Sequence, residues 1–138
     1  MSDLARIVEY FESLTPESVA RLGELYSENA YFKDPFNEVN GRDGIRRVFD
    51  HMFRQVEAPR FRVTDRVADA AGAMLVWEFS FRSRGRETLV RGATHLRFDG
   101  RGKIVYHRDY WDAAEELYAK LPLLGALMRW LRRRLAAR

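Results

Sequence analysis

Five polar residues of this chain of 138 residues are candidates for acid–base chemistry: Tyr10, Asp34, Thr94, His107 and Asp109. Carboxylates and imidazoles accept and release protons, whereas phenol and threonine hydroxyls donate hydrogen bonds to a developing oxyanion. Asp34 ends an apolar segment that begins at Ala30, and on a strand it would share a face with Phe32. Because a carboxylate on an apolar face is costly unless it is paired or used, Asp34 is predicted to be a general base.

Each of these residues also has a purely structural interpretation. Asp34 and Pro35 can form a turn in which the carboxylate is solvated. Tyr10 can be a core residue with a satisfied hydroxyl, His107 can be a core histidine, and Asp109 can pair with a neighbouring arginine. No two of the three histidines have the spacing of a metal-binding pair, so no metal is assigned.

The elements that position these residues follow from the hydrophobic periodicity. Helical spacing occurs at 3–13, from Thr15-Pro16 to Tyr26, and at 45–53. Strands are predicted at 30–34, 61–67, 75–82, 88–98 and 103–111, with a loop at 37–44 and a helix after Asp112. The order ααβαββββα predicts an α+β fold with N-terminal helices packed over one face of a curved antiparallel β-sheet.

Side-chain alternation predicts a pocket on the concave face of this sheet. Residues of the predicted strands and helices form its apolar lining: Tyr26, Phe49, Met52, Phe53, Trp77, Phe79, Phe81 and Trp111. On the last strand, Val105 is predicted to face inward with His107 and Asp109. An apolar cavity with a few polar groups has the composition of a ligand site, so a small apolar molecule is the expected partner.

Composition excludes several classes of protein. Hydrophobic residues make up 46% and aromatic residues 13% of the chain, which argues against disorder, and there is no cysteine for disulfide or thiolate chemistry. The N-terminus does not have the pattern of a signal peptide. No apolar run approaches the roughly 20 residues of a membrane span, so the expected location is the cytoplasm.

The net charge of +4 is concentrated in residues 113–138, so a nucleic-acid-binding body is not expected. We divide the chain into a domain at 1–112 and a basic amphipathic helical extension at 113–138. Leucine and methionine recur in this extension at helical spacing, from Leu117 and Leu121 to Leu135. This stripe is expected to pack across the pocket mouth or a partner subunit. The alternative is binding to an anionic membrane, which Pro122 and Gly125 weaken by interrupting a single long helix.

Several segments carry a resemblance that covers residues 4–112. They are Val8-Glu9-Tyr10-Phe11, Leu25-Tyr26-Ser27-Glu28-Asn29-Ala30, Lys33-Asp34-Pro35, Gly41-Arg42-Asp43-Gly44-Ile45-Arg46 and the run from Thr94 to Val105. In order and spacing the chain resembles the nuclear transport factor 2-like superfamily, and within it the ketosteroid isomerase-like and SnoaL-like polyketide cyclase branch. The resemblance implies a cone-shaped, cystatin-like fold.

The resemblance also implies roles for individual residues. Asp34 falls on the position of the isomerase base and Tyr10 on that of the oxyanion-hole tyrosine. Thr94 replaces the second oxyanion donor, an acid, and Phe49 replaces a supporting tyrosine, for which Tyr26 could partly substitute. His107 and Asp109 correspond to a histidine and an acid that cyclase-like relatives often carry on the last strand.

The expected function is therefore a cofactor-independent isomerase or cyclase that moves a proton on an apolar, steroid- or polyketide-like carbonyl compound. Asp34 would be the base, Tyr10 and Thr94 the oxyanion donors, and His107 and Asp109 auxiliary groups. A non-catalytic binder of an apolar ligand and a protein-interaction module are the alternatives. The outer sheet face, with residues such as Val76 and His95, is expected to join two copies in a homodimer, although it would also suit a solvated sheet.

Overall fold

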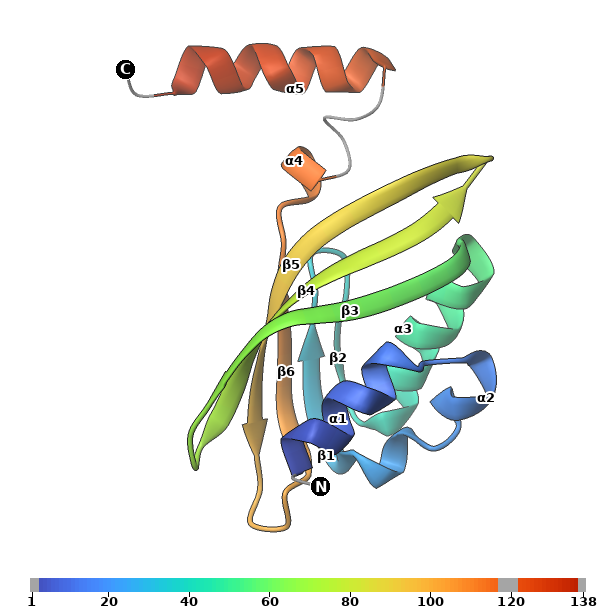
Figure 1. The fold of residues 1–138 in the computed structure, drawn as a ribbon, viewed down its shortest axis with the longest axis vertical. Coiled ribbons are helices and arrows are strands. Elements are labelled where there is room, and N and C mark those ends of the chain that lie inside the picture. Colours follow the sequence, from blue (N-terminus) through green and yellow to red (C-terminus); the bar gives the residue numbers. More distant parts are fainter. Residues whose placement is uncertain (1–2, 117–121, 137–138) are drawn as a thin grey trace.

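A computed structural model of the chain describes residues 3–116 and 122–136. Its centre is a curved sheet of six strands in the order β2-β1-β6-β5-β4-β3 (Figure 1). β1 and β6 are parallel neighbours, and the other neighbouring strands are antiparallel. The strands are β1 (Tyr26–Lys33), β2 (Glu38–Asn40), β3 (Glu57–Ala68), β4 (Gly72–Ser83), β5 (Arg86–Phe98) and β6 (Ile104–Tyr110).

The N-terminal helices lie together on the concave side of this sheet (Figure 1). They are α1 (Asp3–Glu12), α2 (Pro16–Val19), the short 3₁₀-helix η1 (Leu22–Glu24) and α3 (Arg42–Gln55). Buried Ile7 and Phe11 of α1 and Ile45 and Phe49 of α3 belong to one hydrophobic core with inward side chains of the strands. The α+β class, with N-terminal helices over the curved sheet, is confirmed.

The second predicted helix is wrong in its length. Thr15 and Ser18 form a reciprocal capping box, in which the Thr15 Oγ1 accepts the Ser18 N–H and the Ser18 Oγ accepts the Thr15 N–H. The helix that they start ends at Val19, and the 3₁₀ turn follows. Tyr26 was predicted on the helix but begins β1, where it pairs with Ile104 of β6. Tyr26 therefore belongs to the sheet, although helical spacing alone assigns it to the preceding helix.

The predicted loop at 37–44 contains a strand, and the strand predicted to end at Asp34 ends one residue earlier. Asp34 follows β1, and its backbone N–H donates to the Asn37 carbonyl at 2.9 Å. The Asp34 Oδ1 accepts the N–H groups of Phe36 and Asn37 at 2.8 and 2.7 Å. This turn folds β2 back onto β1, so the carboxylate has the structural role that an Asp-Pro turn allows.

A β-bulge in β6 makes the observed alternation of side chains differ from the predicted one. Arg97 pairs with Tyr106 and Phe98 with Ile104, so Val105 is left without a partner in the ladder. Ile104 is buried in place of Val105, which was predicted to face inward. Beyond the bulge the alternation agrees with the prediction, because His107 pairs with buried Leu96 and Asp109 with buried Thr94.

Two C-terminal helices follow the sheet, α4 (Ala113–Glu116) and α5 (Pro122–Leu135). Asp112 caps α4 through its Oδ1, which accepts the Ala114 N–H at 2.9 Å. The buried Glu116 carboxylate accepts the backbone N–H of Arg91 at 2.8 Å and its Nε–H at 3.1 Å. These contacts attach α4 to β5. Pro122 is the first residue of α5, a position that suits proline, whereas Gly125 lies within α5 and does not interrupt it as predicted.

α5 lies beyond α4 at the end of the sheet, away from the N-terminal helices (Figure 1). Its Leu127, Trp130, Leu131 and Leu135 are exposed by 52, 49, 38 and 83%. Leu131 and Leu135 belong to the predicted C-terminal stripe, and their packing across a pocket mouth is therefore wrong. Leu117, Leu121 and the side chains of Leu124 and Met128 lie outside the described residues, and packing of the stripe against a partner subunit stays a prediction. Among the described helices, none is long and apolar enough to cross a membrane. The division of the chain at residue 112 stays a prediction.

Candidate functional site

A chain of side-chain hydrogen bonds connects β1, β6, β5 and β4 on the concave face. The Tyr26 hydroxyl lies 2.8 Å from His107 Nδ1, and His107 Nε2 lies 2.8 Å from Asp109 Oδ1. The Thr94 hydroxyl donates to the same Asp109 oxygen at 2.6 Å and accepts the Trp77 Nε1–H at 2.7 Å. A carboxylate, an imidazole and two hydroxyls therefore act as one connected group.

The strand register brings these residues together. His107 lies beside Phe32 of β1 and opposite Leu96 of β5, and Asp109 lies opposite Thr94. Tyr26, Thr94 and His107 are all less than 5% exposed. Phe32 and Phe11 also contact the imidazole ring, with centroid distances of 4.5 and 5.8 Å. The imidazole is therefore held by aromatic packing as well as by its two hydrogen bonds.

The hydrogen bonds of His107 favour one arrangement of its ring hydrogen. Burial, followed by the nearby Asp109 and Tyr10, raises the pKa of Tyr26 well above its ordinary value, so its hydroxyl stays protonated. Because the Asp109 carboxylate can only accept, Nε2 is the ring nitrogen that donates to it, and Nδ1 can then accept from the Tyr26 hydroxyl. In this arrangement the imidazole and Thr94 both donate to Asp109 Oδ1.

The second oxygen of Asp109 is available for chemistry. Within residues 3–116 and 122–136, Oδ2 accepts no hydrogen bond, and the Asp109 side chain is 17% exposed. Asp109 lines an internal cavity of about 30 Å³, together with Phe11, Phe49, Phe61, Val63, Leu75, Trp77, Thr94 and His107. A carboxylate oriented through one oxygen and unpaired at the other can accept a proton from a bound molecule.

Asp109 also lines an open hollow of about 480 Å³ at the ends of β1 and β6. Asp34 and Trp111 line the same hollow, so two of the predicted site carboxylates meet there. The internal cavity has room for about one water-sized group, whereas the hollow has the volume of a small-ligand site. The predicted single enclosed pocket is thus replaced by a small cavity and an open hollow, with Asp109 in the wall of both.

The structure separates Tyr10 and Asp34 from the hydrogen-bonded chain. The Tyr10 hydroxyl donates to the Ser18 carbonyl at 2.8 Å, which agrees with its structural interpretation. The Asp34 Oδ1 is used by its own turn, and both of its oxygens accept from the Asn37 side chain, at 3.1 and 3.2 Å. Neither group contacts Asp109 or His107 through a hydrogen bond.

The predicted lining is found in part. Phe49 and Trp77 line the internal cavity, and Trp111 lines the hollow. Tyr26 is fully buried behind His107, and four further residues are packed against the core without lining either space: Met52, Phe53, Phe79 and Phe81. Four lining residues were missed: Phe11, Phe61, Val63 and Leu75. Their positions on apolar faces were visible in the sequence, but apolar periodicity does not distinguish core from cavity lining.

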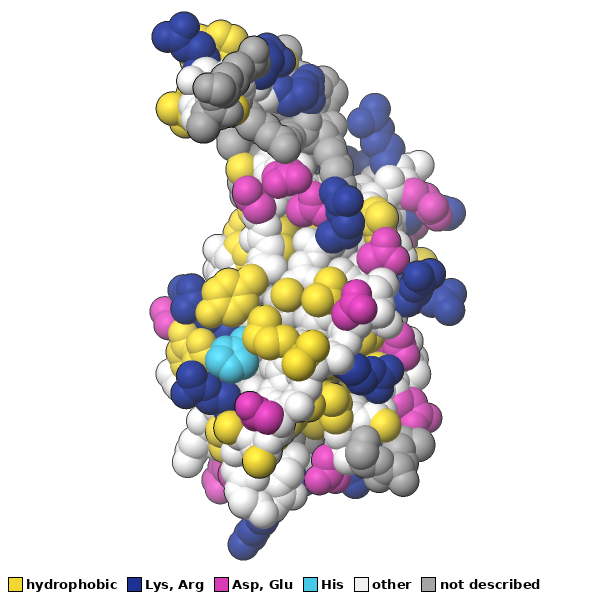
Figure 2. Space-filling model, turned by 60° about the vertical axis from the view of Figure 1, so that its left-hand side comes forward, with side chains coloured by type: hydrophobic (Ala, Val, Ile, Leu, Met, Phe, Trp, Pro, Cys, Tyr) yellow, Lys and Arg dark blue, Asp and Glu magenta, His cyan; other side chains and the backbone are white. Residues whose placement is uncertain are grey.

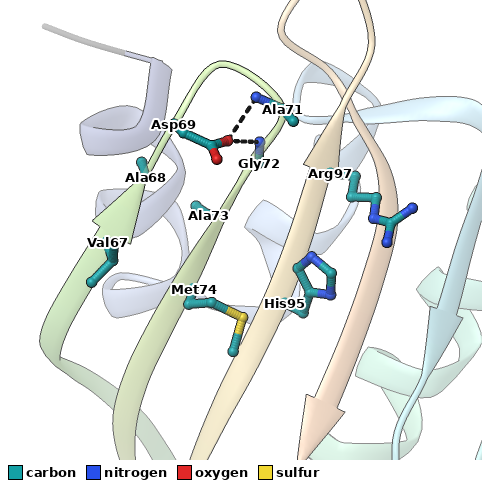
Figure 3. Close-up of a pocket in the computed structure, with 9 residues that line it drawn as sticks. All are labelled: Val67, Ala68, Asp69, Ala71, Gly72, Ala73, Met74, His95 and Arg97. Carbon is teal, nitrogen blue, oxygen red and sulfur yellow. Dashed lines mark hydrogen bonds between the residues drawn. The ribbon is translucent and has the colours of Figure 1, made fainter.

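Another hollow, of about 390 Å³, lies on the opposite face of the sheet near the β3–β4 turn (Figure 3). The Asp69 Oδ1 there accepts the N–H groups of Ala71 and Gly72 at 2.8 and 3.1 Å. His95 and Arg97 pack against the ring of Tyr106, with His95 at a centroid distance of 5.3 Å. His95 therefore faces outward as predicted, and both His95 and Arg97 are packed against the same ring.

Metal binding needs more ligands than this site brings together. His107 and Asp109 are two groups of a ligating type, but the parts of the chain that the structure describes hold no cluster of three such residues.

Gly92 is required for the position of Trp77. The two residues are opposite each other in β5 and β4, and a Cβ on Gly92 would lie 2.5 Å from the Trp77 ring and 3.0 Å from the Trp111 Cβ. Gly92→Ala is expected to displace the indole, weaken its hydrogen bond to Thr94 and lower the free energy of unfolding by at least about 1 kcal/mol. Chemical denaturation measures the loss, and Gly100→Ala, at a position with no neighbouring atom within 4 Å, is the control. Equal stability of the two variants would contradict this packing.

The raised pKa of Tyr10 predicts that the protein loses stability at alkaline pH. Burial raises the pKa of Tyr10 from 10.0 to about 12. The folded chain therefore retains a proton that the unfolded chain releases above pH 10, and stability falls as the pH rises from 10 toward 12. In Tyr10→Phe this part of the loss is expected to disappear, as measured by denaturation at several pH values. If the free energy of unfolding falls equally steeply with pH in the wild type and in Tyr10→Phe, this prediction is wrong.

The curved sheet, the helices on its concave side and the inward-facing acid and imidazole define a small α+β protein of the nuclear transport factor 2-like fold. The chain belongs to the family of SnoaL-like domains, which matches residues 7–107. Asp109 follows the matched segment by two residues, and α5 lies outside it. The predicted family resemblance is confirmed. No curated protein sequence matches the chain.

Solved structures show the same fold. A hypothetical protein with a ketosteroid isomerase-like fold from Catenulispora acidiphila, in complex with trimethylamine, has 18% identity and a TM-score of 0.73 over 88% of this chain and 94% of its own. A protein of unknown function from Burkholderia pseudomallei has 15% identity and a TM-score of 0.73 over 83% and 95%. A protein from Shewanella putrefaciens, named provisionally as a SnoaL-like polyketide cyclase, has 16% identity and a TM-score of 0.70 over 85% and 97%. Likeness at these identities shows the fold alone.

Proposed function

We propose that the chain is a cofactor-independent enzyme that moves a proton on a small apolar carbonyl compound, with Asp109 as the base. The observation that carries this proposal is the asymmetric environment of the Asp109 carboxylate. Its Oδ1 accepts from Thr94 and His107, while its Oδ2 has no partner in the described residues. A general base needs such an oriented and unpaired oxygen within reach of a bound substrate.

The proton transfer needs only groups of this chain and the substrate. A carbon–hydrogen bond next to the carbonyl breaks, its proton bonds to Asp109 Oδ2, and its electron pair forms an enolate. The same carboxyl group then returns the proton to oxygen or to another carbon. Thr94 and His107 keep the carboxyl group in one orientation during both steps, which preserves the geometry of transfer.

The missing oxyanion donor restricts the substrate class. The hydroxyls of Tyr10 and Thr94 donate to Ser18 and Asp109, so neither is free for a substrate oxygen in this arrangement. Loss of one oxyanion donor costs on the order of 10²–10³ in rate, so a substrate that delocalises the charge itself is favoured. A polyketide-like β-dicarbonyl compound has this property, whereas a ketosteroid depends more on the protein.

The space around Asp109 agrees with a substrate that is only partly enclosed. The cavity of about 30 Å³ admits the reacting group, and the open hollow of about 480 Å³ accommodates the rest of the molecule. Trp111 in the hollow and Phe36, whose ring centroid lies 5.6 Å from that of Trp111, offer it an aromatic surface.

Keto–enol tautomerisation of apolar β-ketoesters, followed by ultraviolet absorbance, tests this proposal. Catalysis by the wild-type chain, with weak or no activity on a Δ5-3-ketosteroid, is the expected result. Binding of these compounds in native mass spectrometry without any turnover would instead support the alternative of a non-catalytic binder. That alternative is favoured by the two occupied hydroxyls, Tyr10 and Thr94.

We also propose that two copies of the chain pair through the outer face of the sheet. Hydrophobic side chains gather among charged ones on this side of the molecule (Figure 2). Met74, Val76 and Tyr110 on this face are 40, 44 and 46% exposed. Light scattering is expected to give the mass of a dimer at micromolar concentration, and Val76→Glu is expected to give a monomer. A wild-type monomer under these conditions would contradict the pairing.

A further inference from the structure

Four large apolar side chains of α5 are left exposed by the part of the chain that the structure describes. Leu127, Trp130 and Leu131 are spaced by three and four residues and therefore share one side of the helix, and Leu135 continues it one turn later. All four are exposed, by 52, 49, 38 and 83% respectively. Four large apolar side chains in solvent along one helix are unusual for a soluble surface and indicate a contact outside the chain.

The charged side chains of the C-terminal segment that contains α5 are all basic. Residues 117–138 contain six lysines and arginines and no acidic residue, whereas all of the chain's aspartates and glutamates precede them. Arg129 and Arg133 are exposed, and their spacing from Leu127 and Leu131 places them on a different side of the helix. The Arg134 guanidinium lies over the Trp130 ring, 5.6 Å from its centroid.

We propose that α5 binds the surface of anionic lipid membranes. An anionic bilayer offers hydrocarbon to the leucines and Trp130, and negative headgroups to the arginines, which matches both sides of the helix at once. Trp130 combines an apolar ring with a polar N–H, and such side chains favour the membrane–water interface. The segment has no acidic residue with which to pair basic groups of another protein, so charge complementarity favours lipid over a basic partner.

The geometry suits a helix that lies on the membrane. α5 has 14 residues, and at about 1.5 Å per residue it is shorter than the roughly 30 Å hydrocarbon core of a bilayer. α4 separates α5 from the curved sheet (Figure 1). The hydrogen bonds between Glu116 and Arg91 fix α4 to β5, so a membrane-bound α5 would hold the domain close to the lipid surface. An apolar substrate dissolved in lipid would then be concentrated near the enzyme.

Vesicle co-sedimentation of the full chain tests this inference. We expect binding to vesicles of phosphatidylcholine with phosphatidylglycerol, weak binding to phosphatidylcholine alone, and loss of binding at high salt. Arg129→Gln with Arg133→Gln should weaken binding by about 25-fold, because each basic residue near an anionic surface contributes roughly fivefold. Leu127→Gln with Leu131→Gln should weaken it at least about tenfold.

Matched variants separate lipid binding from general effects. Arg66→Gln with Arg101→Gln removes the same charge from exposed positions of the domain and should leave binding nearly unchanged. Trp130→Phe should keep binding but lose the blue shift of fluorescence on adding vesicles, which the other two tryptophans cannot supply if they stay in the fold.

Three results would overturn the inference. The first is no binding to anionic vesicles, and the second is equal binding to both lipid compositions. The third is a wild-type chain that does not bind vesicles and that light scattering shows to be an oligomer, which Leu127→Gln with Leu131→Gln dissociates. In that case α5 joins copies of the chain. All three readouts are independent of enzymatic activity, so they distinguish failure of this inference from failure of the proposed function.

Discussion

Asp109→Asn is expected to reduce turnover of a β-dicarbonyl substrate by about 10²–10⁴-fold, the usual contribution of general acid–base catalysis. The amide nearly matches the carboxylate in size and can still accept from Thr94 and His107 through its oxygen. It cannot accept a substrate proton, however, because its second group is an NH₂. Steady-state kinetics measure the loss, and substrate affinity should change much less than the turnover number.

Asp34→Asn is the matched comparison for this experiment. Both carboxylates line the hollow beside Trp111, but Asp34 is used by its own turn and by the Asn37 side chain. We therefore expect Asp34→Asn to retain most of the activity. If Asp34→Asn abolishes turnover while Asp109→Asn does not, the base is the one that the family resemblance implied, and the proposal based on Asp109 fails.

Long periodic segments of the chain were predictable from the sequence. β3 to β5, α1 and α3 are long, strongly patterned elements, and their local preferences agree with the way they pack. The inward direction of Thr94, His107 and Asp109 also followed from strand alternation, because one bulge at Val105 changes the pattern only before His107. The class of fold could therefore be predicted with its core and with the strand that carries the site.

Short elements were less predictable because contacts distant in sequence determine them. Tyr26 continues a helical apolar pattern, but pairing with β6 makes it the first residue of β1. β2 has three residues and depends on the turn at Asp34, which sequence alone allows either as a strand end or as a turn. The assignment of Asp34 as a base rested on the first of these alternatives.

The connections among the site residues could not be predicted either. Strand alternation places His107 and Asp109 on one face, but it does not show that Asp109 accepts from Thr94 or that Tyr26 reaches His107. Those contacts depend on the register between β5 and β6 and on the parallel pairing of β1 with β6. These contacts are the reason that we propose Asp109 and not Asp34 as the base.

Tyr26→Phe is expected to lower both stability and turnover. Removing the hydroxyl leaves His107 Nδ1 without its donor in a site where the imidazole is 4% exposed, and an unsatisfied buried polar group costs about 1–3 kcal/mol. The imidazole is then free to carry its hydrogen on Nδ1, so Nε2 no longer donates to Asp109. A hydrogen bond to a charged group contributes about 1.5–3 kcal/mol, which corresponds to a loss of roughly 10–100-fold in turnover.

Tyr10→Phe is the control, because that tyrosine is half-buried and its hydroxyl donates to the Ser18 carbonyl and not to His107. Nitrogen NMR of the His107 ring adds a readout that a merely structural role of Tyr26 would not change. We expect a hydrogen on Nε2 alone in the wild type and in Tyr10→Phe, and a mixture of the two tautomers in Tyr26→Phe. If Tyr26→Phe loses stability but keeps both the wild-type tautomer and the wild-type turnover, Tyr26 only packs in the core. Orientation of the carboxylate would then depend on the Thr94 hydroxyl, which donates to Asp109 and accepts from Trp77.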